Sequence, residues 1–407
     1  MQLGKLKHLL FILIAIFFVY YFVKFPFDKL NNLTDGDILT KAEFDSLKSN
    51  NFIDSNLIAD VFSPEADEEI KEYVVKYRLF NLINIKNLKV KVVDNLNYYA
   101  GGDCLGFSLK SRGAIIIGGN YILTKEGKKN PFKDSGLKIG DIITKLNDKE
   151  INCSNDIVEF LALYDGLNDV DCVVMRENEL QTYKIKPALD IQTKSYKLGV
   201  WVKDTTLGVG TLTFFNEETS RFGALGHAVS IGDNKKGYEI SDGSIYDCRV
   251  IGVKEGESGK AGQLMGTFSE YQKPLGNVDK NCEYGVFGNL EDDAILDFIE
   301  EKSPIEVGGK ATVKPGKAKI LSCIDGKNIK SYDIEIIKTN FQKSSNEKSM
   351  ILRVIDTELL KRTGGIVQGM SGSPIIQNGK LVGAVTHVFL NDASKGFGIY
   401  IDWMVKQ

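Results

Sequence analysis

The stretch GGIVQGMSGSP, residues 364–374, places Ser371 in a glycine-rich turn that ends at Pro374. A tight turn of this composition exposes a hydroxyl group and frees backbone N–H groups to bind an oxyanion. Acyl transfer requires both features. We therefore take Ser371 as the candidate nucleophile.

The same residues also fit a plain turn between two strands. The segment that follows, IIQNGKLVGAV, has the pattern of a strand, an Asn-Gly turn and a second strand. In a turn built as in chymotrypsin-like proteases, the N–H groups of Gly369 and Ser371 would point at the oxyanion, and Gly369 would leave room for substrate. This stretch alone leaves both interpretations open.

Histidine is scarce, and this narrows the choice of a general base. The chain has three histidines, and His8 belongs to the N-terminal segment. A nucleophilic serine needs a base that titrates near neutral pH, usually an imidazole. His227 lies in GALGHAVSIGD, where an apolar run gives way to a loop, and it is the favoured base. The alternative is a histidine that only packs in the core.

His387, in AVTHVFLND, follows Ser371 by sixteen residues. On a chymotrypsin-like barrel this spacing predicts a strand that lines the specificity pocket. There His387 would contact a polar or acidic substrate side chain, or it would form a hydrogen bond within the core. We assign it no catalytic role as long as His227 is the base.

The segments GALGHAVS and DTELLKRTGGIVQGMSGSPIIQNGKLVGAVTHVFLND resemble the peptidase domain of the stage IV sporulation protein B family. That family comprises membrane-anchored serine peptidases of endospore-forming bacteria, with a PDZ domain ahead of the peptidase domain. The resemblance implies the chain order His, Asp, Ser, and the acid that matches is Asp356 in RVIDTELL. Asp233, six residues after His227, is the alternative acid, since either carboxylate would orient the imidazole.

The resemblance also implies a pathway and a location. The protein would be secreted from the forespore into the space between the forespore membranes and would cleave itself in trans. It would also cleave a membrane-bound regulator of an intramembrane metalloprotease, which activates the late mother-cell sigma factor. The alternative is a non-catalytic PDZ scaffold at the spore membrane. The joint presence of His227, Asp356, Ser371 and Gly369 favours the enzyme.

The N-terminal residues 1–25 predict a signal anchor, or transmembrane segment. Lys5 and Lys7 precede the apolar run LLFILIAIFFVYYFV, and no small-residue cleavage site follows it. Residues 26–96 begin with a polar, acidic tether and end in two predicted strands, YVVKYRLF and LKVKVVD.

Residues 97–189 have the pattern of a PDZ domain. The segment DCLGFSL is similar to its carboxylate-binding loop, in which the N–H groups of Leu105, Gly106 and Phe107 would receive a peptide terminus. KDSGLKIGDIITKLNDKEI predicts a short helix and a strand. SNDIVEFLALYDG predicts the helix of the groove, with Ser154 as its N-cap. The alternative is a domain that serves only as a spacer.

Residues 190–407 predict a mainly β serine peptidase domain. Many short apolar runs are separated by Gly, Asn and Asp turns, and LEDDAILDFIEE is the helical exception. This pattern favours a barrel or double barrel of the chymotrypsin type.

Composition excludes several classes of function. A net charge of −3 gives no basic footprint for nucleic acid. The six cysteines, without paired or histidine-linked spacing, predict no zinc site, and we expect no metal or other cofactor. The cysteine spacing leaves the disulfide state open.

Overall fold

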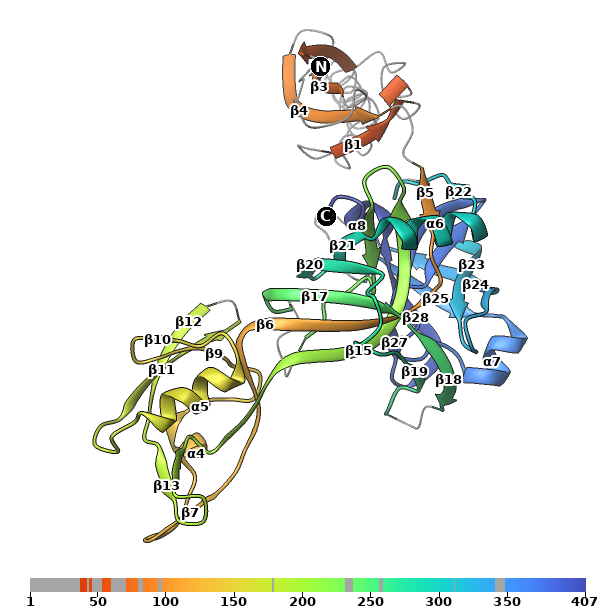
Figure 1. Cartoon of the computed structure of the whole chain (residues 1–407). Helices are drawn as coiled ribbons and strands as arrows, with labels where there is room; N and C mark the ends of the chain where they lie inside the picture. Colours follow the sequence, from red (N-terminus) through yellow and green to blue (C-terminus); the bar gives the residue numbers. More distant parts are fainter. Residues whose placement is uncertain are drawn as a thin grey trace, which may run out of the picture. The chain divides into compact units, whose positions relative to one another are not determined.

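The structure, a computed structural model, is mainly β (Figure 1). It describes residues 37–41, 44–45, 53–59, 71–79, 83–93 and 97–407, except 178, 231–236, 256–258, 311 and 341–347. The predicted anchor at residues 1–25 and the alternative acid Asp233 lie outside the described residues. Within them, no helix combines the length and apolarity that crossing a membrane demands. The chain divides after Asn97 into two compact units, each of which is described by itself.

The first unit contains a four-stranded sheet in the order β1 (Asp37–Thr40), β4 (Ile83–Val93), β3 (Lys71–Leu79) and β2 (Ile53–Ala59). β3 and β4 confirm the two predicted strands. Alternate residues of β4, namely Leu88, Val90 and Val92, are buried, as expected for a strand with one face on a core. The predicted tether also contributes β1 and β2, so part of it is sheet.

The second unit begins with the predicted PDZ region. β12 (Glu179–Ile185), β11 (Val170–Arg176), β9 (Ile142–Leu146) and the end of β6 (Cys104–Gly119) are neighbours in one sheet. Their apolar residues pack with α5 (Ser154–Ala162) in one core. α4 (Pro131–Ser135) is the predicted short helix.

The N-cap of α5 differs from the prediction, because Cys153 holds that position. The Asp156 carboxylate accepts hydrogen bonds from the N–H groups of Asn152 and Cys153, which satisfies donors at this end of the helix. Ser154 is already helical, and its N–H and hydroxyl groups both donate to Asp204 (2.9 Å each).

Two long strands run from the PDZ region into the peptidase region. β6 and β15 (Val200–Asn216) pair antiparallel from Val200 opposite Gly119 to Thr211 opposite Cys104. Figure 1 shows both strands extending between the two regions. A single strand, β15, therefore begins beside the PDZ helix and ends in the peptidase core.

The first half of the peptidase region is an antiparallel sheet. The far end of β15 pairs with β16 (Arg221–Ala224), followed by β21 (Gly285–Leu290), β20 (Gly276–Cys282) and β17 (Ile240–Asp247), which returns to β6. α6 (Asp292–Glu301) is the predicted helical exception. The buried side chains of this half form one apolar core.

The second half is a closed antiparallel barrel, as the turn and strand pattern predicted. Its order is β23 (Gly316–Cys323), β24 (Ile329–Thr339), β25 (Met350–Val354), β28 (Asp392–Tyr400), β27 (Lys380–Phe389) and β26 (Pro374–Gln377). Fully buried aliphatic side chains, including Ile320, Ile334 and Ile375, fill it. α7 (Thr357–Thr363) and the GMSGSP turn connect β25 to β26.

Candidate active site

The turn that carries Ser371 is anchored to β15. The Thr211 N–H donates to the Ser371 carbonyl (3.0 Å), and the Thr211 hydroxyl donates to the Gly369 carbonyl (2.8 Å). The Thr213 hydroxyl donates to the Gly372 carbonyl (2.8 Å). Both threonines are buried. Only glycine fits at 372, where φ is +96° and an added Cβ would lie 2.1 Å from the Thr211 oxygen.

The backbone of this turn presents two N–H groups for an oxyanion. The Gln368 carbonyl accepts from the Leu264 N–H (2.8 Å), and the Met370 carbonyl accepts from the Ser373 N–H (3.0 Å). In a trans peptide the N–H points away from the carbonyl, so the N–H groups of Gly369 and Ser371 face the opposite side. Within the described residues, neither N–H donates a hydrogen bond. An oxyanion hole is built from available backbone donors of this kind.

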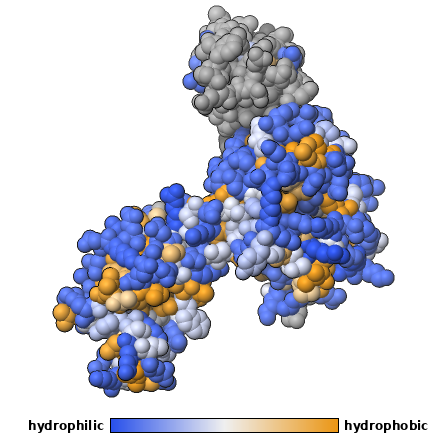
Figure 2. Space-filling view, viewed as in Figure 1, coloured by the Kyte–Doolittle hydropathy of each residue, from blue (hydrophilic) through white to orange (hydrophobic). Residues whose placement is uncertain are grey.

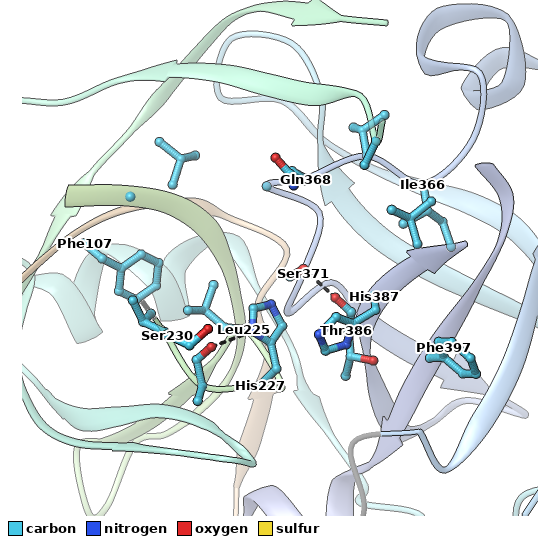
Figure 3. Close-up of a pocket in the computed structure, with 18 of the residues that line it drawn as sticks. Phe107, Leu225, His227, Ser230, Ile366, Gln368, Ser371, Thr386, His387 and Phe397 are labelled. Atoms are coloured by element: carbon cyan, nitrogen blue, oxygen red, sulfur yellow. Dashed lines mark hydrogen bonds between the residues drawn. The ribbon is translucent and has the colours of Figure 1, made fainter. Parts of the chain in front are cut away.

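His227 and His387 meet Ser371 at one pocket of about 660 Å³ (Figure 3). Gly369 and Thr386 also line it. The Nδ1 of His227 lies 2.8 Å from the Ala228 carbonyl oxygen, which can only accept, so Nδ1 carries a proton. In the neutral ring Nε2 then keeps its lone pair, which is the state that a general base needs.

The hydroxyl of Ser371 points at its own barrel in this structure. It donates to the Thr386 carbonyl with an Oγ to O distance of 2.6 Å (Figure 3). Proton transfer to His227 therefore requires the hydroxyl to leave the Thr386 carbonyl and turn toward the imidazole. Such a turn moves only the side chain, so the backbone of the turn can stay in place.

His387 lies on β27 beside the candidate base. Its ring centroid is 4.7 Å from that of His227, with 40° between the ring planes. The expectation that His387 lies on a strand lining the pocket matches this position. Its contact with a substrate side chain stays a prediction.

Asp356 lies in a different environment from a triad acid, which must contact the imidazole. It is the N-cap of α7, and its carboxylate accepts from the N–H groups of Leu359 (3.0 Å) and Asp333 (3.2 Å). It is not among the residues that line the pocket. Of the described lining residues, none carries a carboxylate. The structure thus brings Ser371, His227 and His387 together and places Asp356 apart from them.

The predicted PDZ carboxylate-binding loop requires a correction. Leu105, Gly106 and Phe107 lie inside β6, which pairs with β15 on one edge and with β17 on the other. Because a strand's N–H groups alternate between its two edges, these groups face partner strands on both sides and are not available to a peptide terminus. An added Cβ at Gly106 would lie 2.2 Å from the Phe268 ring, so that position serves close packing.

A groove of the PDZ region lies instead between α5 and the start of β15. It has a volume of about 640 Å³. One face of α5 lines this groove together with residues 198–202. The lining residues on that face include Ser154, Ile157, Val158 and Leu161. Figure 2 shows apolar atoms exposed among hydrophilic ones in this part of the molecule.

The backbone of β15 at this groove has an unpaired edge. The Gly199 carbonyl accepts from Asn120 on the β6 side (2.8 Å). Strand groups alternate between edges, so the N–H and C=O of Val200 face the other side, where no described strand pairs. An extended peptide can add to such an edge.

Sequence reasoning missed the backbone groups that complete the site. The Ala228 and Thr386 carbonyls have no sequence signature, since any residue type supplies a carbonyl. The same holds for Leu264, whose N–H holds the Gln368 carbonyl and belongs to β19 (Gln263–Thr267), about a hundred residues earlier in the chain. Thr211 and Thr213 were visible only as alternate residues of an apolar strand.

Comparison with known proteins adds two family matches. Residues 104–186 match the PDZ domain family. Residues 194–405, just over half of the chain, match the SpoIVB peptidase S55 family. An uncharacterized protein of Methanocaldococcus jannaschii is 33% identical over 103 residues, which cover 24% of this chain and 27% of that protein. The chain thus spans only about a quarter of the length of this relative.

Two crystal structures give weaker likenesses. The Rv3671c protease in its inactive form has a TM-score of 0.27 and 13% identity, and covers 47% of this chain and 78% of its own. The active form of that protease, from M. tuberculosis, has a TM-score of 0.26 and 13% identity. This match covers 48% of this chain and 70% of the protease chain. These values are too low to carry an argument. The family match over residues 194–405 shows that the chain belongs to the SpoIVB peptidase S55 family, with a PDZ domain ahead of the peptidase region.

Proposed function

We propose that this sporulation peptidase is an endopeptidase whose nucleophile is Ser371 and whose general base is His227. One observation carries the proposal: Ser371, His227 and Gly369 line one pocket, at which the N–H groups of Gly369 and Ser371 are available. The Nδ1 proton of His227, held by the Ala228 carbonyl, leaves Nε2 to accept the serine proton. No cofactor is needed for these steps.

The reaction would follow the usual acyl-transfer course. The Ser371 hydroxyl leaves the Thr386 carbonyl, rotates toward His227 and attacks the scissile carbonyl carbon while Nε2 takes its proton. The N–H groups of Gly369 and Ser371 stabilise the negative oxygen that develops. The His227 imidazolium then protonates the leaving amine. Water hydrolyses the acyl enzyme by the reverse sequence, with His227 again as base.

A fluorophosphonate probe tests this assignment against the alternative of a non-catalytic scaffold. The probe reacts with activated serine hydroxyls, so mass spectrometry of the wild-type protein should find the adduct on Ser371. A scaffold with a decayed site would bind partners but would take up no label at Ser371. An adduct on another serine would show that this other serine, and not Ser371, is the nucleophile.

We further propose two substrates from the family resemblance. One is the protein itself, cleaved in trans within residues 26–75. The other is a membrane-bound regulator of an intramembrane metalloprotease, and its cleavage would lead to activation of the late mother-cell sigma factor. This proposal places the enzyme, anchored by residues 1–25, in the space between the forespore membranes. If the Ser371→Ala form in spore-forming cells is trimmed after residue 25 like the wild type, a signal peptidase is responsible and the anchor proposal fails.

A first prediction separates two roles of Asp356. Asp356→Ala removes the N-cap of α7 and should lower the free energy of unfolding by about 1 kcal/mol. Asp356→Asn keeps an oxygen that can accept from Leu359 but loses the acceptor for the Asp333 N–H, so it should be destabilised less than Asp356→Ala, and its peptide-cleavage rate should stay close to that of the wild type. Denaturant unfolding and single-turnover cleavage measure the two effects.

The asparagine variant also tests the acid that the family resemblance implies. A triad aspartate replaced by asparagine loses roughly 10⁴-fold in kcat, because the imidazole takes the wrong tautomer. A loss of that size in Asp356→Asn at unchanged stability would restore Asp356 as the orienting acid. Asp233→Asn, measured in parallel, tests the competing carboxylate.

A second prediction concerns the groove beside α5. Val158 is 64% exposed and lines the groove, so Val158→Glu should leave folding intact and place a charge where an apolar peptide side chain would bind. We expect the Kd for a peptide spanning residues 26–60 to rise roughly tenfold, measured by fluorescence anisotropy with the Ser371→Ala protein. Glu159→Gln, one residue away and outside the groove lining, is the matched control. Equal binding by both variants would exclude this groove as the peptide site.

A further inference from the structure

Three buried cysteines lie close together behind the nucleophile turn. Cys104 begins β6, Cys248 follows β17, and Cys323 ends β23. They come from segments far apart in the sequence, and the cysteine spacing gave no sign that they would meet. All three are free thiols in this structure. The proposed catalytic steps use none of them.

The strand register brings Cys104 and Cys248 close to each other. β6 and β17 pair antiparallel, with Tyr246 opposite Gly106 and Asp247 opposite Leu105. Cys248 follows Asp247, the last residue of β17, and Cys104 precedes Leu105, so a continuation of this register would set the two cysteines across from each other. Directly opposed residues of antiparallel strands have Cα atoms about 4.5–5.5 Å apart, which lies within the range of about 4.4–6.8 Å that disulfides span.

The two thiols also influence each other. Cys104 lowers the pKa of the Cys248 thiol, while Cys248, together with burial, raises the pKa of the Cys104 thiol. Cys323 lies near Cys248 but directs its thiol at the carbonyl oxygen of Gly326, with an Sγ to O distance of 3.3 Å. Cys248 is therefore the better thiolate of the pair, and Cys104 is its natural partner.

A cavity lies beside both cysteines. Cys104 and Cys248 line a pocket of about 980 Å³, although the two residues are only 6% and 1% exposed. Oxidation of thiols that are buried in this way calls for a small disulfide reagent that can enter the pocket.

We propose that Cys104 and Cys248 are a redox pair that forms a cross-strand disulfide when the protein meets a small-molecule disulfide oxidant. The Cys248 thiolate attacks one sulfur of the oxidant, breaking its S–S bond and releasing one thiolate. Cys104, losing its proton, attacks the Cys248 sulfur of this mixed disulfide and releases the second thiolate. The protein loses two electrons and two protons, and the oxidant becomes two thiols.

The bond would join the two backbone supports of the nucleophile turn. Cys104 pairs with Thr211, which holds the carbonyls of Ser371 and Gly369. Cys248 immediately precedes β18 (Arg249–Lys254), the partner of β19, whose Leu264 N–H holds the Gln368 carbonyl. A disulfide here would fasten β6 to the start of the β18–β19 hairpin. It would also close a long chain loop, which restricts the unfolded state.

Peptide mapping of the native protein tests the bond directly. The Ser371→Ala form avoids self-cleavage, so the result does not depend on the proposed catalytic function. After treatment with oxidised glutathione and alkylation of the remaining thiols, a non-reducing digest should contain a Cys104–Cys248 linked peptide. Dithiothreitol should remove it. The linked peptide should persist in Cys323→Ala and be absent from Cys104→Ala.

Thermal unfolding gives a second readout. The oxidised protein should unfold at least several degrees above the reduced protein, and this difference should vanish in Cys104→Ala and remain in Cys323→Ala. Two results would overturn the proposal. One is full alkylation of Cys104 and Cys248 after oxidation of the folded protein. The other is a bond from Cys248 to Cys323 in place of Cys104, which the parent digest would show even if a variant failed to fold.

Discussion

Ser371→Ala is expected to abolish peptide cleavage while the fold remains intact. Removal of the nucleophile of a serine peptidase costs about 10⁶-fold in kcat. The loss to stability should be small, because the hydroxyl of Ser371 makes one hydrogen bond, to the Thr386 carbonyl, at a partly exposed position. Cleavage of a quenched fluorescent peptide and the circular dichroism spectrum measure the two properties.

Ser373→Ala is the matched control for this experiment. Ser373 belongs to the same turn, and its buried hydroxyl makes no hydrogen bond within the described residues. Its removal should therefore leave cleavage unchanged. Retained cleavage by Ser371→Ala, or equal loss in both variants, would show that the turn is structural and that the nucleophile lies elsewhere.

The sequence was sufficient to predict the elements whose pattern is local. α5 and α6 have helical apolar spacing, and β3 and β4 have the alternation of half-buried strands. The prediction of a carboxylate-binding loop at Leu105–Phe107 was wrong, because a Leu-Gly-Phe segment can belong either to a peptide-binding loop or to a paired strand. Long-range pairing with β15 and β17 decided between them, and no local pattern encodes it.

The residues of the candidate site likewise divide into those that the local sequence reveals and those that depend on long-range contacts. Ser371 and His227 were found because few residue types can act as nucleophile and base, and the chain has few histidines. Asp356 was harder, since aspartate is common and serves equally well as a helix N-cap, the role in which the structure places it. The sequence of the turn from Gly369 to Gly372 predicts exposed N–H groups, but their direction depends on distant partners such as Leu264.

The two histidines of the pocket should differ sharply in their importance. His227→Gln is expected to lose about as much activity as Ser371→Ala, roughly 10⁶-fold in kcat, because the serine proton then has no acceptor. His387→Gln should keep its backbone position on β27 and lose far less, with any change seen mainly in KM for substrates with different side chains. Steady-state kinetics on a panel of peptides measures both.

A double variant tests whether His227 and Ser371 act together. Residues that act as one unit are strongly non-additive, so the His227→Gln, Ser371→Ala protein should be no slower than either single variant. His387→Gln combined with His227→Gln should likewise add little if His387 only contacts substrate. If His387→Gln alone abolishes cleavage and His227→Gln does not, the base is His387. The two imidazoles, with 4.7 Å between their centroids, would then have exchanged roles, and His227 would be the neighbour that positions His387.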